Sequence, residues 1–136
     1  MPVVTHREQP LFSDNYEING DTTVYSNDFK FPDLPNEIGY YSLFLFIEDN
    51  GSEILPDVEV NVKLQFIFDS ENEIYGELHD VLDDTGSNSL TVGTKWEARL
   101  DKQSWWKFAE GFRIAITTSG GGGPKLKITY AGVHAR

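Results

Sequence analysis

The chain lacks cysteine altogether and has a single methionine. Without cysteine it can have no disulfide framework, no thiolate nucleophile and no cysteine-based zinc site. Small secreted domains often depend on disulfides, so this absence favours synthesis inside the cell. No stretch approaches the roughly 18 apolar residues of a membrane-spanning helix, and residues 1–8 lack the apolar run of a signal peptide. We therefore expect no membrane anchor and a core that folds unaided.

Aromatic residues and a strict alternation of side chains dominate what is present. The 136 residues include nine Phe, six Tyr and three Trp, which favour β structure. Between residues 58 and 68 apolar and mostly polar side chains alternate, which predicts a long strand with one buried face. Parallel strands are usually covered on both faces, so the pattern favours an antiparallel sheet. The residues expected to face the core are Val58, Val60, Val62, Leu64, Phe66 and Phe68.

Short strands separated by turn residues predict an all-β fold, an antiparallel β-sandwich of jelly-roll type. Residues 1–21, with two prolines and a polar stretch, are predicted to form an extended N-terminal arm, and residues 22–136 a single β-sandwich domain. The apolar run 40–47 is expected to be buried on both sides or to lie at a subunit contact. The other predicted strands are 22–25, 29–31, 74–78, 96–100, 112–118 and 126–130.

Charge is distributed unevenly along the chain, whose net charge is −11 at pH 7. Residues 1–90 contain 19 acidic and 3 basic residues, whereas residues 91–136 contain 3 acidic and 8 basic residues. Two interpretations are open. The basic strands lie beside acidic strands of the same domain, or the basic part of one copy meets the acidic part of the next. Direct binding of nucleic acid is not expected, because most of the surface would repel phosphate.

No arrangement of residues predicts an enzyme, a metal site or a cofactor. A nucleophile needs an adjacent base, and the three histidines are scattered. His79 beside Asp80 would need a remote serine, and no serine lies in a Gly-x-Ser-x-Gly elbow. The acid-rich segments 49–53, 69–73 and 83–88 offer the oxygen ligands that calcium takes, but turn formation explains their composition without a metal.

Trp105 and Trp106 are the most specific candidates for a binding site. Adjacent side chains on a strand point to opposite faces, so both rings cannot enter one core. A loop folded over the sandwich would bury both rings. Otherwise one ring is left for a protein partner or a sugar, and tryptophan is enriched at interface hot spots. With Lys107, which fits a partly exposed segment, these residues are predicted to bind a partner.

The C-terminal segment predicts a hairpin with a basic outer face. Its strands alternate cleanly, with Phe112, Ile114 and Ile116 in one strand and Leu126, Ile128 and Tyr130 in the other expected to face inward. The glycine-rich linker 119–124 between them is either solvated or ordered against a partner. Basic residues alternate with the apolar set and should form one stripe, either solvated or facing an acidic neighbouring subunit. The residues of this predicted partner-binding stripe are Arg113, Lys125 and Lys127.

The same segment carries a resemblance to a known group of proteins. Residues 111–133 contain an Arg-Ile-x-Ile strand, a glycine-rich tip and a strand ending in Thr-Tyr-Ala-Gly. This order resembles small β-sandwich proteins of tailed-phage virions, namely capsid decoration (cement) proteins and related auxiliary structural proteins. The remainder of the chain is similar to them only in general architecture. The resemblance implies a protein that binds the capsid lattice, often as a trimer, and braces the shell against internal pressure.

These observations predict a non-enzymatic virion structural protein that stabilises a phage shell. We expect a homotrimer, assembled in the host cytoplasm, that contacts the major capsid protein or other virion proteins. Apolar and aromatic surface would be buried between subunits, and charge complementarity would fix their register. The alternative is a carbohydrate-binding module or receptor-binding tip that uses exposed tryptophans as a sugar platform.

Overall fold

A computed structural model describes residues 4–5, 11–31, 40–51, 58–101, 109–120 and 124–135. Within these ranges the chain forms strands and turns but no helix, and hence no helix long enough to cross a membrane. The strands are β1 (Val4–Thr5), β2 (Tyr16–Asn19), β3 (Thr22–Tyr25), β4 (Phe29–Lys30), β5 (Tyr40–Asp49), β6 (Glu59–Asp69), β7 (Ile74–Asp80), β8 (Ser89–Leu90), β9 (Lys95–Asp101), β10 (Gly111–Ser119) and β11 (Lys125–Ala135).

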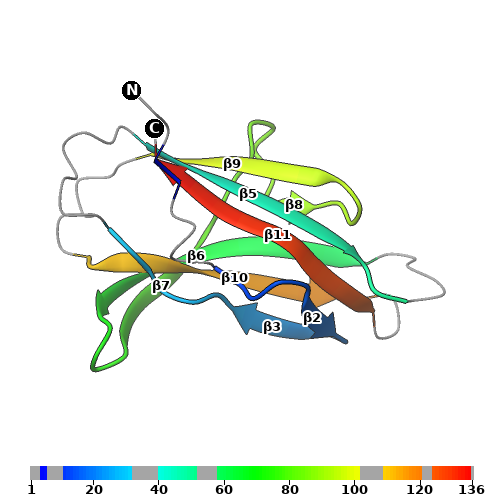
Figure 1. Cartoon of the computed structure of the whole chain (residues 1–136), viewed down its shortest axis with the longest axis horizontal. Helices are drawn as coiled ribbons and strands as arrows, with labels where there is room; N and C mark the ends of the chain where they lie inside the picture. Colours follow the sequence, from blue (N-terminus) through cyan, green and yellow to red (C-terminus); the bar gives the residue numbers. More distant parts are fainter. Residues whose placement is uncertain are drawn as a thin grey trace.

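The strands form two antiparallel sheets that face each other (Figure 1). Sheet I has the order β1-β11-β5-β9, with β2 also paired to β11. Sheet II has the order β3-β10-β6-β7, with β4 also paired to β10 and β8 to β6. The prediction of an all-β, antiparallel architecture is therefore confirmed.

Four of the pairings are nested, so that each one encloses the next along the chain. The innermost pair is β6 with β7, which are joined by a short turn, and β5 pairs with β9 outside it. Outside these, β3 pairs with β10 and β2 pairs with β11. One long antiparallel ribbon thus wraps around the core, and most pairings join residues far apart in sequence.

The core is built from the inward faces of both sheets. In β6 the alternation holds from Val60 to Phe66, whose inward side chains are at most 4% exposed. It fails at Phe68, which was expected to be buried but is 41% exposed, while Ile67 is 1% exposed. Register shifts interrupt the pairing with β7 between Gln65 and Asp69. There the β6–β7 hairpin projects beyond the body of the sandwich (Figure 1). Phe68 is accordingly not part of the core cluster.

Part of the segment expected as an arm is integrated with the two sheets. Leu11 and Ile18 are each 1% exposed and belong to the core cluster, and β2 adds Tyr16–Asn19 to the edge of β11. Of the residues before Leu11, the structure describes only β1. The extended arm therefore remains a prediction for the first residues of the chain.

The predicted C-terminal hairpin is wrong, because β10 and β11 belong to different sheets. The chain leaves sheet II after Ser119 and enters sheet I at Lys125. The inward residues of both strands are buried as predicted, except Tyr130, which is 46% exposed. A β-bulge between Ile128 and Tyr130 inserts one residue and turns Tyr130 outward.

Aromatic rings close one end of the core. Phe29 lies 4.9 Å from Phe112 and 5.4 Å from Tyr41, measured between ring centroids. Burial raises the pKa of Tyr41 to about 12, because the ionised phenol would be poorly solvated there. Phe29 is positioned by the close approach of β4 to β10. This approach requires a glycine at position 111, which pairs with Lys30 of β4. A Cβ at Gly111 would lie 1.9 Å from the carbonyl oxygen of Phe29.

Replacing Gly111 by alanine should therefore lower the free energy of unfolding by more than about 2 kcal/mol, because β4 and β10 would have to separate. Gly76→Ala is the matched control. Its Cβ would lie 2.9 Å from the exposed ring of Phe68, which can rotate away. Urea unfolding of both variants checks the prediction, and equal losses of stability would contradict it.

Candidate functional site

The residues predicted to bind a partner do not form one surface in the structure. Trp105, Trp106 and Lys107 lie outside the described residues. Arg113 lies on the outer face of sheet II, whereas Lys125 and Lys127 lie on sheet I. The predicted basic stripe is therefore wrong, because its two strands are in opposite layers. Whether each residue separately binds a partner remains a prediction.

Arg113 is held in a clamp of aromatic and amide groups, which we call the Arg113 clamp. Its guanidinium carbon lies 4.2 Å from the ring centroid of Tyr25 and 3.7 Å from that of Tyr75. Its Nε donates a hydrogen bond to Gln65 Oε1 at 2.7 Å, and Gln65 Nε2 donates to the carbonyl oxygen of Gly76 at 2.9 Å. Four strands thus supply the clamp: β3, β6, β7 and β10.

The clamp rests on a closed apolar floor. Ala115, opposite Tyr25, and Ile67, opposite Tyr75, are each 1% exposed, although both lie on the outer face of sheet II. The rings and the guanidinium therefore cover the sheet at this point, with Tyr25 remaining 42% exposed. Leu78, opposite Gln65 on the neighbouring strand, extends the patch and is also 42% exposed.

Two cations on the outer faces, Arg113 and Lys127, have no ion pair within 4.0 Å among the described residues. In the described part of the molecule, the ion pair within 4.0 Å joins Lys63 to Asp80, both from the acidic first 90 residues. Neither Arg113 nor Lys127 has such a pair there, although Lys127 lies opposite Glu48. Both explanations of the charge asymmetry, pairing between strands and contact between copies, therefore remain predictions.

The outer face of sheet I carries an aromatic platform, which we define as Tyr130, Gly132, His134 and Phe44. The phenol of Tyr130 passes over Gly132, where a Cβ would lie 2.6 Å from the hydroxyl oxygen. That hydroxyl lies 3.1 Å from His134 Nε2 in a hydrogen bond, and the imidazole makes an edge-to-face contact with Phe44 at 5.0 Å. The bulge that displaced Tyr130 from the core thus creates this platform.

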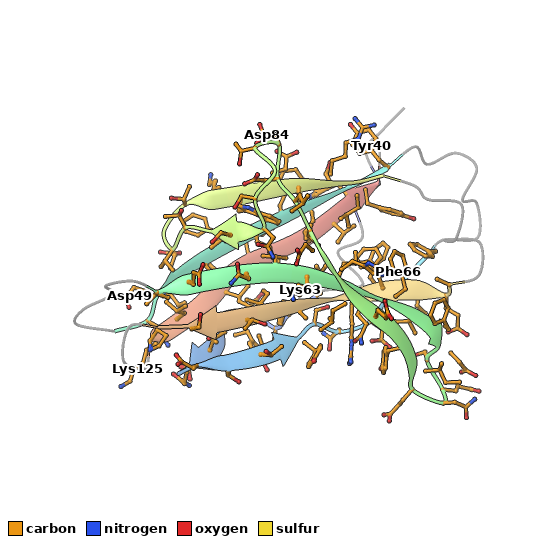
Figure 2. All side chains as sticks on the ribbon, turned by 180° about the vertical axis from the view of Figure 1, so that it is seen from behind. Tyr40, Asp49, Lys63, Phe66, Asp84 and Lys125 are labelled. Atoms are coloured by element: carbon orange, nitrogen blue, oxygen red, sulfur yellow. The ribbon has the colours of Figure 1, made fainter. Side chains whose placement is uncertain are left out.

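A cleft of about 640 Å³ opens along the edge strand β9. The loop that follows β7 forms one wall, and Figure 2 shows Asp84 of this loop projecting beside β9. The cleft is lined by Leu82, Asp83, Asp84, Lys95, Trp96, Glu97 and Arg99. The indole N–H of Trp96 is buried and donates no hydrogen bond to a described residue. It still adds, after the larger effects of Thr85 and Ser87, to the lowering of the pKa of Asp83.

Two of the acid-rich segments, 69–73 and 83–88, are explained by turns, whereas segment 49–53 lies partly outside the described residues. Asp83 Oδ1 accepts hydrogen bonds from Thr85 Oγ1 at 2.6 Å, Thr85 N at 2.9 Å and Ser87 N at 3.0 Å. Asp69 accepts two from Asn72. These bonds lower the pKa of both aspartates. The largest effect on Asp83 comes from the Thr85 side chain, and the largest effect on Asp69 comes from the Asn72 side chain. Among the described residues, no group of three or more His, Asp or Glu side chains is placed to hold a metal ion.

His79 and Asp80 do not form a catalytic pair in the described structure. They are adjacent on β7 and therefore point to opposite faces of sheet II. The ring of His79 lies 6.2 Å from that of Phe66, a core residue. Asp80 instead accepts a hydrogen bond from Asn88 Nδ2 at 3.0 Å and faces Lys63.

Sequence reasoning placed Arg113 on an outer face but missed the rest of its clamp. The alternation of β6 indicated that Gln65 points outward, yet nothing local pairs it with a residue 48 positions away. Tyr25 and Tyr75 are also far from Arg113 in the sequence. The aromatic platform carried a detectable signal, because residues 130, 132 and 134 alternate, but that signal was obscured by the bulge.

Comparison with known proteins shows similarity of fold to virus particle proteins. No protein-family model and no curated protein sequence matches the chain. The structure is similar to a chain of infectious bursal disease virus, Gt strain, with a TM-score of 0.58 and 13% identity over 98% of this chain. A chain of the T13 particle of this virus gives 0.54 at 13% identity, and a chain of its VP2 subviral particle gives 0.54 at 12%, both over 98%.

This similarity concerns only part of the viral proteins. The chain spans 31%, 30% and 31% of the length of those three chains, respectively. At this level of identity the similarity shows the fold, and any function of the whole viral proteins is a matter for proposal.

Asp83 provides a test of the loop beside the cleft. Its lowered pKa means that folding favours the carboxylate, so its stabilisation is present above the pKa of the unfolded state and is lost as pH falls through the lower folded pKa. Asp83→Asn should therefore reduce stability at neutral pH, and its deficit should shrink below about pH 4. Urea unfolding midpoints across this range check the prediction.

Asp84→Asn is the control for this experiment, because the structure shows no hydrogen bond to the Asp84 side chain. It should leave the midpoint unchanged at neutral pH. A deficit of Asp83→Asn that is constant with pH would show that the charge of Asp83 is not what stabilises the loop.

Proposed function

We propose that this protein is a non-enzymatic structural component of a virion. The observation that carries the proposal is the similarity of fold, over 98% of the chain, to chains of infectious bursal disease virus particles. Two of those structures are described as particles of this virus, a T13 viral particle and a VP2 subviral particle. The protein proposed here would act through contacts between its own copies and other virion proteins.

The topology supports a jelly roll as the finer description of the fold. Jelly rolls have eight main strands in two sheets and are common in viral capsid domains. Here β2, β3, β5 and β6 pair with β11, β10, β9 and β7 in nested order, as expected when one long ribbon is wrapped into two sheets. The short strands β1, β4 and β8 add to the edges.

The surface supports self-association. Six large apolar or aromatic side chains are between 41% and 51% exposed, and they occur on both sheets. These residues are Tyr25, Phe68, Ile74, Leu78, Leu82 and Tyr130. The apolar run 40–47 was expected either to be buried on both faces or to lie at a subunit contact. Its outward residues Phe44 and Phe46 are only partly buried, which favours the subunit contact.

The finer assignment that we propose is a decoration or cement protein of a tailed-phage capsid, acting as a homotrimer and assembled in the host cytoplasm. The resemblance of residues 111–133 supports it, together with the acidic surface, which would avoid packaged nucleic acid. Trp105, Trp106 and Lys107 would contribute to the contact with the lattice. The protein would need neither a cofactor nor a catalytic residue for this role.

Light scattering coupled to size exclusion should show an oligomer, with a trimer as the expected mass. Measurement at protomer concentrations up to about 100 µM detects association free energies as weak as about 5.5 kcal/mol. Electron microscopy of the same samples would reveal closed particles. A protein that is monomeric throughout this range would contradict the proposal of self-association.

A second candidate function, carbohydrate binding, is favoured by the aromatic platform of sheet I. Tyr130 is 46% exposed, lies across Gly132 and is fixed at its hydroxyl by His134. A fixed, exposed ring can stack on the apolar face of a sugar, and Lys95 and Glu97 on β9 lie in line with Phe46 and Phe44 to supply polar contacts. The site differs from the tryptophan pair that the sequence indicated.

A glycan array separates the two functions. If the platform binds sugar, Tyr130→Ala should abolish the signal, and Gly132→Ala should weaken it at least tenfold, because its Cβ would displace the ring. Tyr25→Ala, which removes a similarly exposed ring from the opposite sheet, is the matched control and should retain binding. Absence of any glycan signal from the unmodified protein would rule this second function out.

A further inference from the structure

The Arg113 clamp leaves one part of the guanidinium unused. Its guanidinium carbon lies close to the rings of Tyr25 and Tyr75, which come from strands on opposite sides of β10, and its Nε donates a hydrogen bond to Gln65. Among the described residues, Nη1 and Nη2 have no hydrogen-bond acceptor, and no carboxylate lies within 4.0 Å of the group. Tyr25, Tyr75 and Gln65 thus hold the planar guanidinium in place. Its Nη1 and Nη2 atoms are left for a ligand.

This geometry selects a particular kind of ligand. The guanidinium edge matches the two oxygens of a carboxylate and binds it bidentately, which a lysine cannot do. Fixing the guanidinium in advance removes much of the ordering cost that a flexible arginine would incur on binding. The apolar floor and the exposed rings beside it would exclude water from the contact and strengthen it.

We propose that the Arg113 clamp receives a carboxylate side chain from a second copy of this chain. The inference rests on the proposed function, because it identifies the contact through which copies associate. Charge complementarity supports a second copy as the source. Residues 69–84 contain seven acidic residues and no basic residue. Within the part of the chain that the structure describes, four of these carboxylates have no hydrogen bond or ion pair, and they are Glu71, Glu73, Glu77 and Asp84.

The position of these acids makes the contact geometrically reasonable. The β6–β7 hairpin, which holds three of the four, projects from the body of the sandwich in both views (Figures 1 and 2). Arg113 itself lies on β10, two strands away from β7 in the sheet, whereas the acids lie in the β6–β7 turn, on β7 and in the loop after it. A contact between two different surfaces is heterologous, and such contacts close into rings when the rotation permits, as in a trimer.

The test measures association by sedimentation equilibrium in the full chain. Arg113→Lys keeps the charge but loses the planar fork, and Tyr75→Leu keeps the arginine but removes one wall. Each should weaken association at least tenfold, which corresponds to about 1.4 kcal/mol. The combined change of the four free carboxylates to amides, E71Q, E73Q, E77Q and D84N, should weaken it to a similar extent.

Arg99→Lys is the matched control. Arg99 also stacks on a tyrosine, with its guanidinium carbon 3.9 Å from the ring centroid of Tyr40, but it lies on the opposite sheet. It should leave association unchanged, and thermal unfolding of each variant should confirm that it remains folded.

The outcomes separate this inference from the proposed function. If the unmodified protein associates and Arg113→Lys associates equally well, the clamp is not the contact, while the structural role stands. If Arg113→Lys and Tyr75→Leu weaken association but the amide variant does not, the carboxylate does not come from the β6–β7 region of a second copy, and the proposal is overturned. If the unmodified protein is a monomer, both fail.

Discussion

Burial of one face of each central strand is the interaction on which the rest of the structure depends. The inward side chains of β5, β6, β10 and β11 meet between the two sheets and are almost entirely removed from water. Because side chains alternate along a strand, fixing the inward set also fixes which residues point outward. Arg113 faces outward because Phe112 and Ile114, on either side of it, are both in the core.

The outer faces are therefore available for contacts that the fold itself does not need. Sheet II displays a fixed arginine between two tyrosines, and sheet I displays a tyrosine laid across a glycine. Both arrangements hold a large side chain still at a partly exposed position. Such fixed groups are suited to recognition, because little conformational freedom remains to be lost on binding. They therefore suit the role that we propose, which depends on contacts with other proteins.

Charge adds direction to these contacts. The first 90 positions contain 19 acidic residues. Seven of them lie between residues 69 and 84, in the projecting β6–β7 hairpin and the loop that follows it. Arg113, in the basic C-terminal segment, has no acidic partner in the described structure. An acidic projection and an unpaired, fixed cation on one molecule favour head-to-tail association. The same charge opposes approach to phosphate-rich polymers.

The sequence by itself determined the long strands and most of their inward faces, because alternation is a local property and needs no knowledge of pairing, but it missed the short strands β1, β2 and β8. It correctly indicated Val60–Phe66 and Phe112–Ile116, and it placed Arg113 on an outer face. Only the tertiary structure decided which strands are neighbours, and this assigned β10 and β11 to different sheets and divided the expected basic stripe. One bulge turned Tyr130 outward, and long-range pairing brought Tyr25, Gln65 and Tyr75 to Arg113. Such juxtapositions depend on contacts between distant segments, whose energies are not encoded in any short stretch of sequence.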